Sequence, residues 1–276
     1  MISATDLRDY QGKYLSRSES FLYTPPHPLL APFISCYTLS FPTPATMPDA
    51  YSILPSASCT VVASAFDAGV SVHLRGVNAS ASNVGAHANR ARMLVLVEFR
   101  PGCLHPFLRI DQQELLDASH PLGALEPSLS RAIARVAEES ASAEALFSAL
   151  DALLIPMAAA DSRDALVRNV VRLIRARRGN ADARTLTDAF HYGEKHLRRM
   201  FLERVGVGPK LFARIARVNC AARLIRTTDL AHADVAAQAG YFDQPHLIRD
   251  FREICGVTPL QYARNMSDFY NDAYKL

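Results

Sequence analysis

The chain has 276 residues, of which 49% are hydrophobic and 21% are charged. This length suits two domains with cores of their own, and the composition is that of a folded protein rather than a disordered one. No apolar run approaches the roughly 18 to 20 residues of a membrane span, and the N-terminus lacks the apolar core of a secretory signal. We therefore expect a cytoplasmic protein that makes no membrane contact.

The net charge of +3 conceals an asymmetry between the two halves of the chain. Residues 1–164 hold 11 Lys/Arg and 16 Asp/Glu, a net charge of −5, whereas residues 165–276 hold 19 Lys/Arg and 11 Asp/Glu, a net charge of +8. A basic segment joined to an acidic segment indicates a module that binds a polyanion, attached to a module with another task.

The first 110 residues carry short apolar runs bounded by Pro, Ser, Asp, Gly and Asn, which is the pattern of strands and turns. Four runs are predicted as strands: Phe33–Tyr37, Cys59–Val62, Val70–Leu74 and Met93–Phe99. The last of these is the clearest, because Pro101 and Gly102 follow it directly. The pattern predicts a small β-rich barrel or sandwich.

From about residue 126 the spacing of apolar residues becomes helical. We predict one helix from Pro127, a second over Ala145–Leu154 and a third over Arg163–Arg177. The small and polar residues 158–164 are predicted as a linker. The chain is thus divided into a β-rich domain over 1–157 with a helical tail from about 126, the linker, a basic helical domain over 165–266 and a tail over 267–276.

The basic domain contains a copy of itself displaced by fifty residues. Residues 196–214 align without a gap with residues 246–264, and ten of the nineteen paired positions are identical. Self-similarity at a fixed period indicates one supersecondary unit used twice. Two copies of a basic helical unit suit a partner that repeats, and duplex DNA is the obvious candidate.

The second copy has the signals of a helix, a turn and a second helix. A first helix over Asp234–Ala239 ends at Gly240, where a left-handed conformation is expected, and Asp243 is a good N-cap for the next helix. In that helix Leu247, Phe251 and Ile254 share an inward face. The polar side chains then lie on other faces, where a major groove could receive them.

The first copy repeats this plan with a denser positive charge. It has a helix over Leu186–Phe190, a turn at 191–193 and a helix over Glu194–Leu202. Between the copies, Pro209–Thr227 predicts a connector helix on the order of 27 Å long. Because successive major-groove faces lie about 34 Å apart, such a connector can place two recognition helices one turn apart.

The residues of the second copy resemble a known family. Val235–Tyr262 carries the pattern Val-Ala-x-x-x-Gly-Tyr-x-Asp-Gln-x-His-Leu-x-Arg-x-Phe, followed by Gly-x-Thr-Pro-x-x-Tyr, of AraC/XylS-type transcriptional regulators. The first copy, from His196 through Pro209, is similar to the paired motif of that family. The resemblance covers residues 165–266 and implies two helix-turn-helix subdomains joined by a long helix.

The resemblance also implies which side chains meet DNA. Carried over by position, the groove-facing residues are Lys195, Arg198 and Arg199 of the first unit and Gln244, His246 and Arg249 of the second. This chain departs from the family at three places. His191 replaces a turn glycine and Gly193 replaces an N-capping serine, which weakens the first turn, and Pro245 removes one polar side chain.

The N-terminal part resembles the cupin-like domain that precedes this type of DNA-binding domain in a subset of the family. The similar segments are Ile53–Pro55, Cys59–Val62 and Val97–Gly102. The resemblance implies a domain that senses a small molecule or mediates dimerisation. The expected fold is α+β, with a β-rich cupin-like barrel before an all-α tandem helix-turn-helix domain.

The sequence gives little indication of an enzyme active site or of a metal site. His73, His87, His105 and His120 are isolated, without metal-ligand spacing, and no common hydrolase, NTPase or dinucleotide-binding motif is present. The five cysteines form no CxxC pair, which suits reduced thiols. We therefore expect no catalytic residue, metal or cofactor. Two alternatives remain open: a cupin-type metal enzyme, or a sensor based on a cysteine such as Cys103, fused to the DNA-binding module.

The leading hypothesis is a sequence-specific regulator that binds double-stranded operator DNA. Its expected further partners are a small-molecule effector, a second copy in a homodimer and RNA polymerase. A third hypothesis is a structural nucleoid protein, which would bind DNA without sequence preference.

Overall fold

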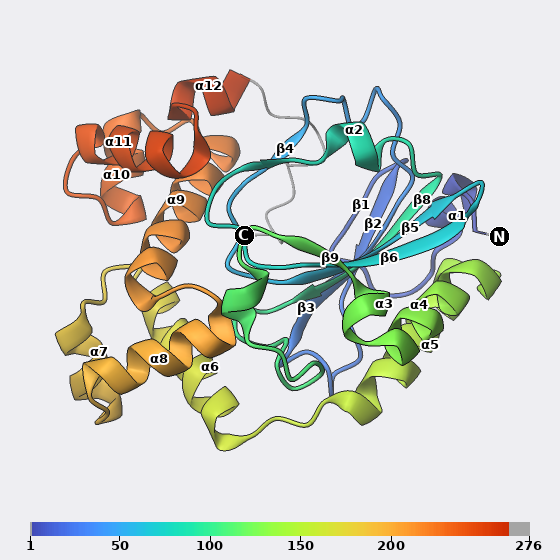
Figure 1. Ribbon diagram of the computed structural model, residues 1–276. Helices are drawn as coiled ribbons and strands as arrows, with labels where there is room; N and C mark the ends of the chain where they lie inside the picture. The colour runs from blue at the N-terminus through green and yellow to red at the C-terminus, as the bar shows by residue number, and fades with distance from the viewer. Residues whose placement is uncertain (1, 265–276) are drawn as a thin grey trace.

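The computed structural model describes residues 2–264 as a sheet-based N-terminal part beside a helical C-terminal part (Figure 1). The predicted tail 267–276 and the last residues of the predicted 165–266 domain lie outside the described residues. The main sheet is antiparallel, in the order β1-β2-β3-β8-β5-β6-β9. Its strands are β1 (Ser16–Arg17), β2 (Phe21–Thr24), β3 (Ile34–Ser40), β5 (Thr60–Phe66), β6 (Gly69–Arg75), β8 (Met93–Phe99) and β9 (Ser119–Pro121).

All four predicted strands are confirmed, as β3, β5, β6 and β8. β5 runs four residues beyond its prediction. Ala63, Ser64 and Ala65 are small and weak strand formers, but they belong to the strand because they pair with β6 and β8. Tertiary pairing therefore decides this segment of the strand.

The central strands separate two environments through their alternating side chains. In β5, Val61, Ala63 and Ala65 belong to the main hydrophobic core, whereas Thr60, Val62 and Ser64 line a cavity on the opposite face. The core face is covered by α4 (Pro127–Glu139) and α5 (Ala143–Leu154), which match the predicted helical tail. α1 (Ala4–Asp9) packs near β2.

The cavity face is covered by a separate two-stranded ribbon, β4 (Ser52–Ile53) with β7 (Ser82–Asn83), and by α2 (Gly85–Ala88). The predicted α+β class with a β-rich N-terminal part is confirmed. In the described residues, however, the sheet is open: β1 and β9 stand at its two edges and do not pair with each other. Short connections complete this region: α3 (Leu122–Leu125) and the 3₁₀ turns η1 (Gln112–Leu115) and η2 (Ile155–Met157).

The helical part contains the predicted tandem arrangement. α6 (Ser162–Ala176) precedes the first unit, α7 (Ala183–Phe190) and α8 (Glu194–Val205), and the connector α9 (Pro209–Thr227) leads to the second unit, α10 (His232–Ala239) and α11 (Gln244–Cys255), followed by α12 (Pro259–Arg264). α6 begins inside the predicted linker 158–164, because Asp161 and Asp164 form a reciprocal capping box that starts the helix at Ser162.

The hydrophobic core does not follow the expected division into two domains. One cluster joins the sheet, α4, α5 and α6 to the first helix-turn-helix unit and the start of the connector, where it includes Phe201 of α8 and Phe212 of α9. The second unit has a separate cluster around Phe251, and Leu54 of the N-terminal part is a member of it. The N-terminal part is therefore packed against both units. Among residues 2–264, no helix is long and apolar enough to cross a bilayer.

Candidate DNA-binding interface

The two recognition helices, α8 and α11, present different side chains at corresponding positions. In α8, Lys195, Arg198 and Arg199 are exposed, while Leu197, Met200 and Phe201 are buried beneath them. This separation follows from the helical spacing of the sequence. The three predicted cations therefore share the solvent-facing side of α8.

The second recognition helix carries less charge. Arg249, the repeat mate of Arg199, is exposed, but the mate of Arg198 is Ile248 and that of Lys195 is Pro245. Gln244 is half-buried in the first turn. His246 is also half-buried, with its ring centroid 5.2 Å from that of Tyr241. Arg249 is thus the most accessible of the three side chains predicted in this helix.

The turns before the two recognition helices differ from each other, as the sequence predicts. Asp243 caps α11 by accepting a hydrogen bond from the His246 N–H at 2.7 Å, whereas Gly193 offers α8 no side-chain cap. His191 ends α7 with φ of 56°, a left-handed conformation that is strained for a residue with a Cβ. Gly240, with φ of 86°, ends α10 without that strain.

A polar network centred on the buried Asp250 fixes α11 on the connector helix. Arg214 of α9 places Nη2 2.6 Å from Oδ1 of Asp250, a residue that is 5% exposed, and 2.7 Å from Oε2 of Glu253. Tyr241 donates its hydroxyl to Oδ2 of Asp250 at 3.2 Å. The mate of Asp250 in the first unit is the buried Met200, so this network belongs to the second unit alone.

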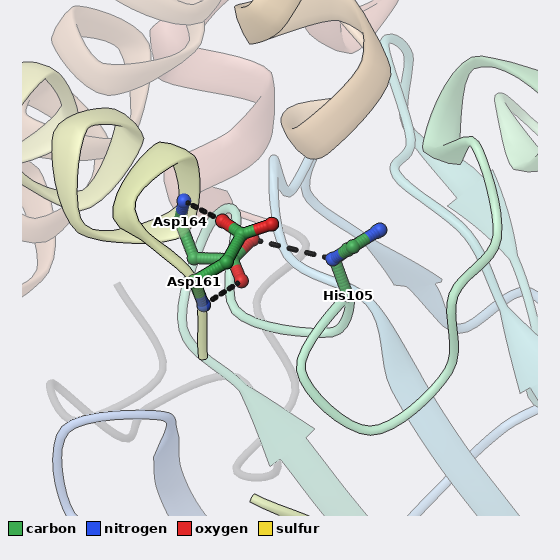
Figure 2. A group of neighbouring side chains, drawn as sticks. All are labelled: His105, Asp161 and Asp164. Atoms are coloured by element: carbon green, nitrogen blue, oxygen red, sulfur yellow. Dashed lines mark hydrogen bonds and ion pairs between the residues drawn. The ribbon is translucent and has the colours of Figure 1, made fainter. Parts of the chain in front are cut away.

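The first unit has its own charged anchor, which ties the end of α8 to the start of α6. The guanidinium of Arg204, at the end of α8, lies 3.0 Å from Asp164 and 3.4 Å from Asp161. Figure 2 shows His105, from the loop after β8, directed at the same carboxylates, with its Nδ1 3.3 Å from Oδ1 of Asp164. One sequence signal points to this cluster: Arg204 is buried at a position whose repeat mate is the buried, apolar Ile254.

His105, Asp161 and Asp164 also have the donor set of a metal site, with ligand atoms within 4.8 Å of one another. Here, however, the guanidinium of Arg204 already forms ion pairs with both carboxylates. Burial and the charge of Arg204 lower the pKa of His105, which favours its neutral form. The backbone N–H of Asp164 lowers the pKa of Asp161 and keeps it ionised. The arrangement therefore suits an ion-paired joint between the linker, α8 and the N-terminal part.

This joint predicts a loss of stability in mild acid. A base whose pKa is lowered by folding binds its proton more weakly in the folded chain, so the free energy of unfolding falls as the pH drops below the ordinary value of 6.5 for His105. Urea unfolding between about pH 7.5 and 5.5 should show this decline, and His105→Gln should flatten it. Parallel pH profiles for the two proteins would contradict the assignment.

The N-terminal part also touches both units directly. Gln112 of η1 approaches the end of α8 so closely that a Cβ on Gly206 would lie 2.7 Å from its carbonyl oxygen. On the second unit, Leu54 is buried among α9, α10 and α11. Asn219 of α9 donates to the Pro55 carbonyl at 3.1 Å, and the Ala81 N–H donates to the Ile254 carbonyl at 3.3 Å.

A cavity of about 600 Å³ lies between the sheet and the ribbon, beside these contacts. Its floor is the alternate face of β5, β6 and β8, including Val62 and Leu96. His73 and His87, which the sequence leaves isolated, both line it. Asn219 and Arg226 of α9 line it as well, so the cavity is bounded by both the N-terminal and the helical parts of the chain.

The cysteine alternative loses support from the position of Cys103. Its side chain is buried, at 1% exposed. Burial raises the pKa of the Cys103 thiol to about 12, which disfavours the reactive thiolate. Cys59 and Cys255 are buried with similarly raised pKa values. These three thiols suit packing rather than redox sensing.

Comparisons with known proteins assign both regions of the chain to families. A helix-turn-helix domain model matches residues 186–265, and a model of a domain of unknown function, DUF6597, matches residues 23–121. The F1 operon positive regulatory protein of Yersinia pestis is 34% identical over 83 residues, which cover 30% of this chain and 27% of that protein. The match thus spans about a quarter of this relative.

Solved structures are also similar. A probable AraC family transcriptional regulator from Rhodopseudomonas palustris is 24% identical, with a TM-score of 0.32 over 36% of this chain and 94% of its own. ToxT from Vibrio cholerae is 10% identical, with a TM-score of 0.43 over 76% of this chain and 90% of its own. Residues 186–265 therefore belong to the helix-turn-helix domain family, in the form found in AraC-type transcriptional regulators.

Proposed function

We propose that the chain is a sequence-specific DNA-binding transcriptional regulator whose N-terminal part responds to a small molecule. The observation that carries this proposal is the duplicated helix-turn-helix unit with exposed cations at one repeat position, Arg199 and Arg249. A helix of this kind in the major groove reads base edges through its exposed polar side chains, and basic side chains contact phosphates.

The two units contribute unequally to the contacts with bases and with phosphates. α8 offers Lys195, Arg198 and Arg199 but is preceded by a strained, uncapped turn. α11 offers Arg249, with Gln244 and His246 at its start, on a capped helix held by Arg214. We therefore assign most of the base discrimination to α11 and much of the phosphate attraction to α8.

Arg249→Ala is expected to weaken operator binding by about 1–3 kcal/mol and to relax preference at one base pair, as loss of a bidentate contact to a base does. A gel-shift titration measures the effect on the operator and on single-base variants of it. Arg131→Ala, which removes an exposed arginine from α4, is the matched control and should bind normally. Equal affinity of Arg249→Ala and the control for the operator would remove Arg249 from the interface.

The operator itself is to be found by mapping the binding sites of the full chain across the genome of its host. A sequence-specific regulator gives discrete sites that share a motif. A structural nucleoid protein gives broad occupancy without a motif, and that result would overturn the proposal.

The cavity beneath the ribbon is the proposed effector site. Its volume lies within the range of small-molecule sites, and its floor combines apolar side chains such as Val62 and Leu96 with polar ones such as His73 and Glu98. Because Asn219 and Arg226 belong to the connector α9, an occupant would contact the helix that joins the two DNA-binding units. Effector binding would thereby alter how α8 and α11 are presented. Homodimer formation and contact with RNA polymerase remain predictions of the same proposal.

A further inference from the structure

One large apolar side chain stands on the surface of the second helix-turn-helix unit. Phe242 is 93% exposed in the turn between α10 and α11. Its neighbours hold it in place on both sides, because Tyr241 is buried at 5% exposed and Asp243 caps α11. The backbone of Phe242 is thus fixed while its ring lacks a packing role inside the molecule.

The first unit places an aromatic ring at the same point. Tyr192, fifty residues earlier, is 44% exposed in the turn between α7 and α8. Its ring stacks on that of His196 at a centroid distance of 5.2 Å. Single exposed apolar residues are common on protein surfaces. An exposed aromatic at the same turn position of both copies, beside turn residues that differ, instead points to a shared partner.

The position of these rings indicates what the partner is. Each turn leads directly into the recognition helix, whose N-terminal residues are the ones that approach base edges in helix-turn-helix proteins. Exposed cations follow each turn, Lys195 in the first unit and Arg249 in the second. A surface with this charge suits duplex DNA, and in the major groove the apolar group available to a phenyl ring is the methyl group of thymine.

We propose that Phe242 is a specificity-determining residue that packs against a thymine methyl group where α11 enters the major groove, with Tyr192 in the corresponding place before α8. This inference rests on the proposed DNA-binding function. It adds an apolar contact to an interface otherwise described by charge and hydrogen bonding.

An apolar contact and a phosphate contact respond differently to salt. Phe242→Ala should lower operator affinity about tenfold, by the same factor at about 50 mM and about 200 mM salt, because no counterion release is lost. Phe242→Leu should keep most of the affinity. Because the ring is exposed, the alanine variant should unfold at the wild-type temperature. Leu260→Ala, which truncates a side chain 48% exposed on α12, is the matched control and should bind normally.

The thymine is identified by replacing each thymine of the mapped operator with uracil, which removes the methyl group alone. One such replacement should weaken wild-type binding and leave the binding of Phe242→Ala unchanged. If every uracil operator weakens both proteins equally, the thymine contact is excluded. Unchanged affinity of Phe242→Ala for the operator also overturns the inference, and a loss of transcriptional output alone would assign Phe242 to a protein partner. If the wild-type chain does not discriminate its mapped sites from other DNA, the proposed function itself fails.

Discussion

Arg204→Ala is expected to lower the free energy of unfolding by about 3–5 kcal/mol, because it leaves buried carboxylate charge without its partner. Asp164 is fully buried, and Arg204 is the only arginine or lysine within ion-pair distance of it among residues 2–264. Arg204 also joins Asp161 to α8, so its loss should loosen α8 from the linker and from the start of α6. Equilibrium urea unfolding of the full chain measures the change.

The control for this prediction is Arg199→Ala, which removes an exposed arginine from the same helix and should change stability by well under 1 kcal/mol. Adding Asp164→Asn to Arg204→Ala should recover some of the loss, because the stranded charge is then absent. A loss below about 1 kcal/mol in Arg204→Ala would show that the ion cluster does not hold α8 against α6.

Leu54→Ala is expected to cost about 2–5 kcal/mol of stability, as is usual when a buried leucine is truncated. Leu54 is 7% exposed and lies within the hydrophobic cluster of the second unit, although it belongs to the segment just after β4. The same side chain lines the proposed effector cavity. The variant should therefore separate the unfolding of the second unit from that of the rest of the chain.

Leu29→Ala, which truncates a leucine that is 62% exposed, should leave stability nearly unchanged. Fluorescence and circular dichroism recorded in parallel during unfolding should reveal two transitions in Leu54→Ala, against the single transition expected for the wild type. Wild-type stability and a single coincident transition in Leu54→Ala would contradict the role given to this contact.

Together these contacts attach the N-terminal domain to the helical region at two separate points. It contacts the first unit through Gln112 at Gly206 and the adjoining ion cluster through His105, and it contacts the second unit through Leu54 and through Pro55, which accepts from Asn219. Both units are therefore held in one arrangement by the domain whose sheet forms the floor of the cavity. Under the proposed function, a ligand that alters either attachment would change DNA binding.

Much of this molecule could be predicted from local sequence. The strands β3, β6 and β8 follow from short apolar runs, and the tandem helices follow from apolar spacing, from Gly240 and from the cap at Asp243. These features are determined by residues close together in the chain. The inward side of α8 could be predicted for the same reason, and with it the exposure of Lys195, Arg198 and Arg199.

The contacts between the N-terminal and helical regions could not be predicted in this way. Pro55 and Asn219 meet across 164 residues, and nothing near either residue indicates the other. The open edge at β9 depends likewise on how distant strands pair. His105 is isolated in sequence and joins Asp164 only because the linker folds back over the loop after β8. The mismatch of Arg204 with Ile254 in the repeat is the one local sign of this joint.

The central claim is that two helix-turn-helix units of this chain read DNA sequence. The most direct measurement is competition binding of the full chain to a duplex carrying a mapped site, against a duplex of the same composition in scrambled order, at near-physiological salt. We predict that the mapped site is bound at least about a thousandfold more tightly, and that Arg249→Ala reduces this ratio. Equal affinity for the two duplexes, with the same dependence on salt, would contradict the claim.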